Sequence, residues 1–440
     1  MIPQEVCNFR GHVESITCVS EFEYNGNLTL VSSDSRGWIF WWDMKKRRPI
    51  SVWRGHQASI ISLFQASKNI LISHSRDSDI KLWNISVYKN CNPAIPERDS
   101  TDGSNQVAED DFHTKTNPAP EFKVIPVNAL SYCNVAYSNG CLITPATTNS
   151  NNFDIYQLFA NDDRLNEFTL DDLKLKRVST SVDPVKLYER HSGRKALEEN
   201  LDEGLQDMSK RGGFGIIMRI MWISSDTFYL GFESGHVLGL SIQFNEMYHE
   251  KITEVTTGSS KLVLNKEPKI SVVYYSNESV PNPILSMAHS PDKSSVLCGS
   301  TSKYMYIHPT TKDETRGQRE IFENLHHSGI QSISVKSGLI VVGFWSGYVK
   351  GYSLDFKQQF KYSSKLPQIE CLESNESQAK ESARSSMLKL THCHIVNLDG
   401  LKINTQLMRP RLSRNDIRKK NLLVLGYSDG TIKILELFDK

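Results

Sequence analysis

Short apolar runs separated by polar, glycine-containing turns follow one another along most of the chain. Typical runs are Thr227–Phe232, Leu339–Phe344 and Leu422–Tyr427, each of strand length. The turns that follow them are Glu-Ser-Gly, Trp-Ser-Gly and Ser-Asp-Gly. Apolar runs this short, ended by glycine turns, are typical of β-strands joined by hairpins. The pattern therefore predicts an all-β protein.

Near the N-terminus the pattern repeats with a period of about 42 residues. Gly11-His12 recurs as Gly55-His56 after 44 residues, and Trp42-Asp43 recurs as Trp83-Asn84 after 41 residues. Gly-His and Trp-Asp pairs at this spacing are the signature of the WD40 repeat, in which each unit forms one four-stranded blade of a β-propeller. The repeat therefore predicts a propeller.

Buried polar groups are predicted to fix the geometry of the first two blades. In this repeat family an Asp in a tight turn accepts a hydrogen bond from the His, which lies against a strand Ser and the Trp N–H. Such groups stabilise a blade only when all of them are satisfied together. The predicted tetrads are His12, Ser32, Asp34 and Trp42 in the first unit, and His56, Ser75, Asp77 and Trp83 in the second. The triplet Ser35-Arg36-Gly37 lengthens the turn of the first unit.

Five further units keep the hairpin rhythm without the full signature, which gives seven blades. They comprise 127–137 with 153–158; 216–223, 227–232 and 235–242; 284–289, 295–299 and 304–308; 330–335, 339–344 and 348–354; and 387–398, 422–427 and 431–437. The seventh unit has no outer strand, and residues 5–10 have no blade of their own. We therefore expect this N-terminal strand to close the ring and remove an exposed sheet edge.

Seven blades of about 42 residues need about 290 residues, which leaves roughly 150 residues for inserts. Residues 1–440 are therefore predicted to form a single propeller with inserts at 91–120 (a disordered linker), 161–213 (partly helical), 366–386 and 404–420 (loops). In the second insert Leu197, Leu201, Leu205 and Met208 share one helical face. That face packs on the propeller, docks on a partner, or belongs to a disordered segment.

The charge balance changes the picture of the partners. Lys plus Arg is 51 and Asp plus Glu is 50, so the formal net charge of +1 argues against a protein that coats nucleic acid. The sum averages an acidic linker near 97–111 against basic clusters at 45–48 and 409–420. The basic clusters are interpreted as nuclear signals, contacts for acidic partners, or solvated loops.

Cysteine usage and hydropathy bear on the compartment. Eight cysteines occur singly, with no CxxC pair, at 7, 18, 91, 133, 141, 298, 371 and 393. This favours reduced thiols in the cytosol or nucleus. No window approaches the ~18 apolar residues of a membrane span, and the N-terminal residues lack the profile of a secretory signal. We therefore expect no membrane association.

Candidate chemistry is sparse. In His392-Cys393-His394 the two imidazoles share a strand face, but no carboxylate or further Cys stands at ligand spacing, which favours a strand with half-buried polar positions over a metal site. His326-His327 stands where the sixth unit would carry its Gly-His pair. The glycines of 211–215 lack the spacing of a phosphate-binding loop, and hydrolase, protease and kinase signatures are missing. We therefore expect no catalytic residue, cofactor, metal or small-molecule substrate.

Several segments go beyond generic WD40 character. They are 47–56, 72–83, 125–133, 231–237, 343–351 and 426–434. In this order they resemble the fungal ASTRA-associated WD-repeat protein family, which is similar to the metazoan G-protein-β-like WD proteins. The resemblance implies a non-catalytic subunit of the ASTRA assembly, in the nucleus, with the cytoplasm left open. It also implies a role in chromatin regulation or in the maturation of PI3-kinase-related kinases. The implied partners are RuvB-like AAA+ ATPases, the TTT co-chaperone and a PI3-kinase-related kinase or pseudokinase.

Three other functions share this fold, because the fold alone does not decide function. A peptide reader would use the axial opening to grip a modified tail, with an aromatic cage or Arg cluster at the opening. A G-protein-β-like signalling subunit would need an N-terminal coiled coil, whereas ten residues without heptads precede the first Gly-His. A propeller hydrolase would need clustered carboxylates or a triad, of which the sequence gives no sign.

Overall fold

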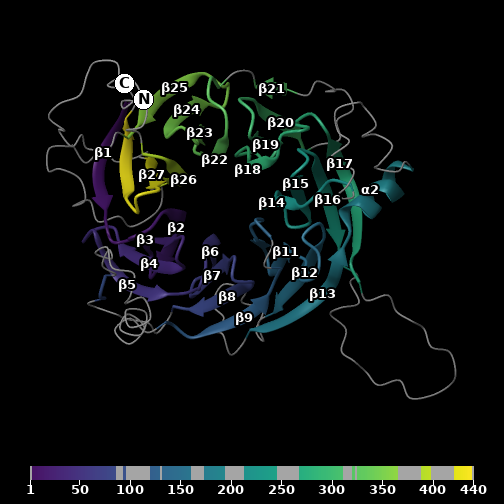
Figure 1. The fold of residues 1–440 in the computed structure, drawn as a ribbon, viewed down its shortest axis with the longest axis horizontal. Helices are drawn as coiled ribbons and strands as arrows, with labels where there is room; N and C mark the ends of the chain where they lie inside the picture. The colour runs from purple at the N-terminus through teal and green to yellow at the C-terminus, as the bar shows by residue number, and fades with distance from the viewer. Residues whose placement is uncertain are drawn as a thin grey trace, which may run out of the picture.

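Seven four-stranded antiparallel sheets stand around a central axis in the computed structural model, which confirms the predicted seven-bladed β-propeller (Figure 1). The structure describes residues 2–85, 93–95, 119–128, 131–159, 173–193, 213–244, 267–310, 320–322, 325–364, 388–397 and 421–438. Among these residues, no helix is both long and apolar enough to cross a membrane.

The first four blades follow one another along the chain, each from its inner strand to its outer strand. Blade one holds β2 (Ile16–Tyr24), β3 (Asn27–Asp34), β4 (Trp38–Asp43) and β5 (Arg48–Arg54). Blade two holds β6 (Ile60–Ser67), β7 (Ile70–Ser75), β8 (Asp79–Asn84) and β9 (Phe122–Pro126). Blade three holds β10 (Ala136–Ser138), β11 (Cys141–Pro145), β12 (Phe153–Phe159) and β13 (Lys174–Val182). Blade four holds β14 (Ile217–Trp222), β15 (Thr227–Phe232), β16 (Val237–Gln243) and β17 (Lys269–Ser276).

Blades five and six repeat this order, and blade seven joins the two ends of the chain. Blade five holds β18 (Ile284–His289), β19 (Ser295–Ser300), β20 (Met305–Pro309) and β21 (Glu320–Phe322). Blade six holds β22 (Ile330–Lys336), β23 (Leu339–Phe344), β24 (Tyr348–Ser353) and β25 (Gln358–Ser363). Blade seven holds β26 (Leu390–Asn397), β27 (Asn421–Tyr427), β28 (Ile432–Phe438) and, as its outer strand, β1 (Ile2–Phe9).

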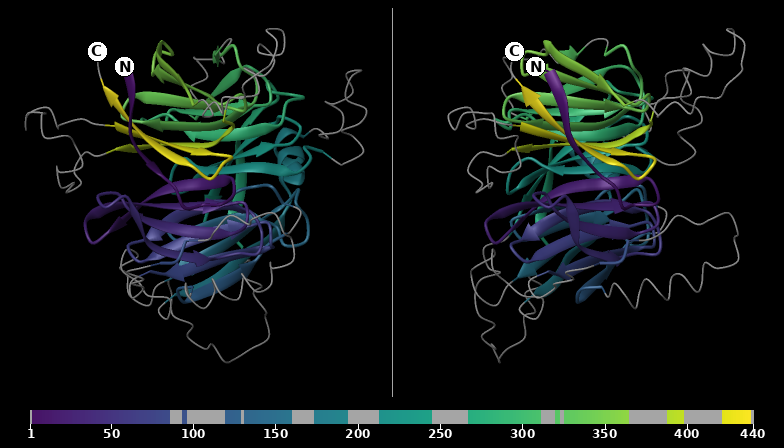
Figure 2. Two further views of the ribbon diagram at one scale, coloured as in Figure 1. Left: turned by 60° about the vertical axis from the view of Figure 1, so that its left-hand side comes forward. Right: turned by 90° about the vertical axis from the view of Figure 1, so that its left-hand side faces the viewer.

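The N-terminal strand closes the ring. β1 pairs antiparallel with β28, from Ile2 opposite Phe438 to Phe9 opposite Ile432. The two ends of the chain therefore lie side by side, as both views of Figure 2 show. Without β1, the backbone groups along one side of β28 would form an open sheet edge. The pairing confirms the closure predicted from the sequence.

The apolar core lies between the blades rather than inside any one of them. Seven clusters of buried hydrophobic side chains occur among the described residues, and each combines residues of two adjacent blades. A single sheet cannot cover both of its faces, so each blade is stable only when flanked on both sides. Stability therefore depends on the closed ring.

Glycines in the second strands allow the blades to approach closely. A Cβ on Gly231, Gly299, Gly343 or Gly426 would lie 2.4–2.7 Å from the aliphatic side chain that opens the inner strand of the next blade. A Cβ on Gly37, which has a φ of +87°, would lie 2.1 Å from the His56 carbonyl oxygen. Only glycine meets these requirements without displacing the backbone.

Outer strands account for the main differences from the sequence prediction. The insert expected at 161–213 contains β13, which belongs to blade three, and α2 (Pro184–Ser192). The side chains of Lys174 to Arg177 are exposed, so β13 lacks the apolar run that identifies a buried strand. The stripe Leu197–Met208 lies outside the described residues, as do 366–386, 404–420 and most of 91–120.

Helix α2 docks on the rim of blade four. Asp183 caps its N-terminus by accepting hydrogen bonds from the amides of Val185 (2.9 Å) and Lys186 (3.2 Å). Pro184 occupies the first turn, and Gly193 ends the helix in the left-handed conformation. The buried Tyr188 ring stacks on Tyr275 of β17, with 4.3 Å between the ring centroids.

We predict that Phe9→Ala destabilises the whole propeller. The Phe9 ring is buried between blades seven and one and stacks on Trp42 at 4.9 Å. Its loss should lower the free energy of unfolding by about 3–5 kcal/mol. Thermal unfolding measures the effect, and Gln4→Ala, an exposed position on the same strand, is the control. Equal melting temperatures for the two variants would contradict a stabilising role for β1.

Candidate functional site

The tetrad of blade one is joined as the sequence suggests. His12 Nδ1 lies 2.8 Å from Asp34 Oδ2, and His12 Nε2 lies 2.7 Å from Ser32 Oγ. Trp42 Nε1 donates to the same Ser32 oxygen at 2.7 Å. The longer turn is held by Asp34 Oδ1, which accepts from the amides of Arg36 and Trp38 at 3.0 Å. All four side chains are buried, so they form a satisfied polar network.

In blade two the serine of the tetrad is Ser73, which corrects the prediction of Ser75. His56 Nε2 lies 2.6 Å from Ser73 Oγ, and Trp83 Nε1 donates to that oxygen at 2.7 Å. Ser75 Oγ instead donates to the carbonyl of Ala58 at 2.9 Å. Ser73 and Ser75 share one strand face, so the two-residue spacing used in blade one gave the wrong serine. The tetrad serine Ser73 is the fourth residue before Asp77, whereas Ser32 is the second residue before Asp34.

Asp77 holds the other ring nitrogen of His56. His56 Nδ1 lies 3.1 Å from both carboxylate oxygens of Asp77. Burial lowers the pKa of His56 even though Asp77 lies against it. Burial would raise the pKa of Asp77, but hydrogen bonds from His56 and the Gln57 amide lower it to about 2. The pair is therefore a neutral imidazole on a carboxylate, suited to structure rather than to proton transfer.

The other sequence candidates have structural surroundings. The ring of His327 stacks on Tyr348 at 4.5 Å. Phe214, inside the glycine-rich segment, is buried against Phe232. In the basic cluster 45–48, Asp43 Oδ1 accepts from the amides of Lys45 (2.8 Å) and Lys46 (2.9 Å) in the β4–β5 hairpin. The cluster 409–420 lies outside the described residues.

His392 and His394 are held neutral by burial. Burial lowers the pKa of His392 to about 3 and that of His394 to about 4. Cys393 lies on the other face of the strand, where burial raises its pKa to about 11. Within the part of the chain that the structure describes, no three His, Cys, Asp or Glu side chains gather as metal ligands would.

The inner strands of six blades carry a β-bulge at the same place. The ladder register shifts in β2, β6, β14, β18, β22 and β26 between the aliphatic residue that opens the strand and the second residue after it. A bulge leaves the backbone of its extra residue unpaired within the ladder. At each bulge, a side chain from the preceding blade can therefore form a hydrogen bond with the backbone of the inner strand.

Seven side chains at this level form a ring in which each blade is bonded to the next. The members are Cys18, Ser62, Asn134, Arg219, Ser286, Ser332 and His392, each hydrogen-bonded to the backbone of the following blade. Cys18 Sγ, for example, donates to Ile61 O at 3.0 Å, and Ser286 Oγ donates to Ile330 O at 2.9 Å. His392 completes the circle through the backbone of Val19 in blade one.

The sequence alone does not reveal this ring, because its seven members belong to five residue types, Cys, Ser, Asn, Arg and His. Six of them share a position, the second residue after Ile16, Ile60, Ile217, Ile284, Ile330 or Leu390, which open inner strands, whereas Asn134 lies in the segment that leads into β10. These aliphatic side chains are almost completely buried between blades. An aliphatic residue followed two positions later by a residue able to hydrogen-bond is too common a pattern to identify a ring on its own.

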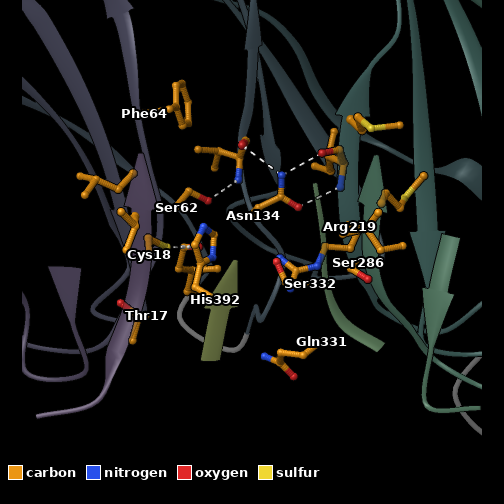
Figure 3. A pocket seen from close by; sticks show the side chains of 18 of the residues that line it. Thr17, Cys18, Ser62, Phe64, Asn134, Arg219, Ser286, Gln331, Ser332 and His392 are labelled. Carbon is orange, nitrogen blue, oxygen red and sulfur yellow. Dashed lines mark hydrogen bonds between the residues drawn. The ribbon is translucent and has the colours of Figure 1, made fainter. Parts of the chain in front are cut away.

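The ring surrounds an axial cavity of about 350 Å³. Figure 3 shows Ser62, Asn134, Arg219, Ser286, Ser332 and His392 arranged around it, with Thr17 and Gln331 beside them. Among the residues that the structure describes, the lining contains no Asp, Glu or Lys, and Arg219 carries its one formal charge. The lining of the cavity is thus mixed, polar and apolar, and among the described residues it offers no carboxylate for acid–base or metal chemistry.

We predict that Ser73→Ala destabilises the protein more than Ser75→Ala. Removing the Ser73 hydroxyl leaves the buried Trp83 Nε1–H without its acceptor and His56 Nε2 without its donor, at about 1–3 kcal/mol. Ser75→Ala removes bonds to carbonyls at the end of a strand and should cost less. Chemical denaturation with each variant measures the difference. The reverse order would restore Ser75 to the tetrad.

We also predict that the protein loses stability as the pH falls from 7 to 5. Burial lowers the pKa of His74 to about 3, and neither of its ring nitrogens has a hydrogen-bond partner. His392 and His394 are lowered in the same sense. The unfolded chain binds protons at these groups below about pH 6.5, where the folded protein does not, so stability is complete above that pH and falls below it.

The measurement is the melting temperature at pH 7 and pH 5. His74→Leu removes one of the buried imidazoles with a lowered pKa and should reduce the loss of melting temperature. His191→Leu, at an exposed position of α2, is the matched control. An unchanged pH dependence in His74→Leu would contradict the assignment.

Comparison with known proteins identifies the family. The model of the family described as ASTRA-associated protein 1 matches residues 5–435. Relatives named ASTRA-associated protein 1 occur in Debaryomyces hansenii (37% identical, 99% of this chain and 100% of the relative) and Meyerozyma guilliermondii (33%, 99% and 100%). A third, from Scheffersomyces stipitis, is 30% identical over 98% of both chains. The match spans every blade of the ring, so the chain belongs to the ASTRA-associated protein 1 family.

Proposed function

We propose that this protein is a non-catalytic scaffold subunit of the ASTRA assembly. The observation that carries the proposal is the family match across a complete propeller ring. A propeller presents rigid surfaces on two faces and a rim, which suits the simultaneous binding of several proteins. The polar networks of blades one and two build the blades, and the axial lining has no carboxylate, so the described residues favour binding over catalysis.

The proposal extends to partners and place of action. We infer that the chain binds RuvB-like AAA+ ATPases, the TTT co-chaperone and a PI3-kinase-related kinase or pseudokinase. We infer that it acts in the nucleus, in chromatin regulation and in the maturation of such kinases. These inferences rest on the name of the family and the resemblance of the sequence. Basic clusters at 45–48 and 409–420 and an acidic segment near 97–111 supply surfaces of both signs for different partners.

One face of the ring carries the residues best suited to a protein interface. Neighbouring strands of a blade are antiparallel. The loop that leads into the inner strand of each blade therefore lies at the same end of the propeller as the turn between its second and third strands. At this end Tyr132 and Trp345 are about half exposed (52% and 47%). Arg76 lies over the Tyr132 ring at 4.5 Å and donates to its hydroxyl at 3.1 Å. Tyr, Trp and Arg dominate the binding energy of protein interfaces.

Affinity purification of the full chain from its native cells, followed by mass spectrometry, tests the proposal. We expect stoichiometric recovery of the proposed partners. The double variant Tyr132→Ala/Trp345→Ala should keep its melting temperature within about 1 °C and lose at least one partner by about tenfold, because exposed anchors contribute to binding more than to folding.

Leu354→Ala is the matched control, because Leu354 is similarly exposed (46%) but follows the third strand of its blade, at the opposite end. It should retain every partner that Tyr132→Ala/Trp345→Ala loses. Recovery of the chain without any stoichiometric partner would overturn the scaffold function. Loss of the same partners in all variants would overturn the choice of face.

A further inference from the structure

A guanidinium without a counter-charge points into the axial cavity. Figure 3 shows the Arg219 side chain reaching from β14 into the space enclosed by the ring. Its Nε–H donates to the carbonyl of Leu285. The structure gives Arg219 no ion pair with any described carboxylate. The bond to Leu285 therefore uses one of its five donors and leaves the terminal nitrogens directed at the cavity.

The surroundings of Arg219 do not neutralise it. The described ionisable groups that interact electrostatically with Arg219 are the thiols of Cys133 and Cys18 and the imidazole of His392. Burial raises the pKa of Cys18 to about 11, and burial also raises that of Cys133, so both thiols are uncharged at neutral pH. His392, which also faces the cavity, is neutral because its pKa is lowered to about 3. A cation enclosed by protein without a compensating charge is costly, and an anion relieves that cost.

Other unused donors face the same cavity. The side-chain oxygen of Gln331 accepts from Trp345 Nε1 at 2.5 Å, which turns the Gln331 amide nitrogen away from that contact. Ser62 Oγ accepts from the Val135 amide at 3.1 Å, so its own O–H is available to donate. The backbone carbonyls of Ile61 and Leu285, by contrast, are occupied by ring side chains. The cavity therefore offers donors and one positive charge.

The volume sets the size of the ligand. A water occupies about 30 Å³ in the liquid, so a cavity of about 350 Å³ holds roughly ten waters. This admits a phosphate ion or a carboxylate side chain together with part of its hydration. The terminal nitrogens of a guanidinium match the spacing of two oxygens of such a group.

We propose that the axial cavity binds an oxyanion, a carboxylate or a phosphate group, through Arg219. The bond from Arg219 to Leu285 holds the guanidinium in place, so the anion meets a positioned donor pair. The oxyanion comes from solution or from an acidic residue that a partner inserts along the axis. The site is independent of the proposed function, since a free anion would occupy it in the isolated protein.

The first experiment follows the melting temperature of the full chain against sodium phosphate and sodium acetate, with sodium chloride keeping the ionic strength constant. A ligand that binds only the folded protein raises this temperature with concentration. We expect a rise of roughly 2–4 °C near saturation in the unmodified protein. Arg219→Gln should abolish the rise and Arg219→Lys should retain part of it. Arg190→Gln, which removes an exposed arginine of helix α2, is the matched control and should keep the full rise.

A second measurement does not depend on the folding of a variant. Crystals of the unmodified protein soaked in sodium selenate should show an anomalous peak inside the cavity beside Arg219.

To distinguish a free anion from an acidic residue of a partner, the rise in melting temperature with a short glutamate-containing peptide is compared with the rise with its glutamine counterpart. A larger rise with the glutamate peptide than with acetate assigns the site to a partner residue, and equal rises assign it to a free anion. A phosphate effect as large in Arg219→Gln as in the unmodified protein, or selenate absent from the cavity, would overturn the proposal.

Discussion

The hydrogen bonds by which each blade is held, near the axis, to the backbone of the next blade are the constraint on which this propeller depends. A β-bulge gives six inner strands an extra residue, whose backbone groups cannot pair within their own sheet. Buried backbone groups must find partners, and at Ile61 and Leu285 the carbonyl of the extra residue is bonded by the ring side chain of the preceding blade. Because each blade satisfies its neighbour, the ring is stable only when every blade is present.

Closure by β1 meets the same requirement, that backbone groups be paired, at the outer edge of blade seven. The strand that begins the chain pairs with β28 near the end of the chain, so blade seven cannot form from local sequence alone. The Phe9–Trp42 contact and the apolar cluster around it link that blade to blade one. Long-range pairing of this kind requires the chain to enclose the whole ring before the last sheet is complete.

The ring positions need a hydrogen-bonding side chain but do not require any one residue type. A ring position can therefore carry a side chain that also serves binding. Five members are uncharged Cys, Ser or Asn side chains, and His392 is kept neutral by burial. Arg219 alone brings a charge to the axis, although a neutral donor would satisfy the carbonyl of Leu285 equally well. The exposed pair Arg76 and Tyr132, and Trp345 above Gln331, lie at one end of the same axis. Rigid walls with polar groups at the centre and aromatic anchors on one face suit a scaffold in an assembly of the ASTRA type.

The sequence by itself determined the propeller, the seven blades, the closing strand and the tetrad of blade one, because apolar alternation, glycine turns and Gly-His pairs are local patterns. It placed the tetrad serine of blade two at Ser75 instead of Ser73, since alternate residues of a strand share a face and spacing alone does not choose between them. It also missed the polar outer strand β13 and the ring around the axis. Only the tertiary structure decided those features. An outer strand such as β13 forms by pairing with the strand beside it and does not need an apolar run. The seven positions between Cys18 and His392 are far apart in the sequence and become one ring only when the blades close.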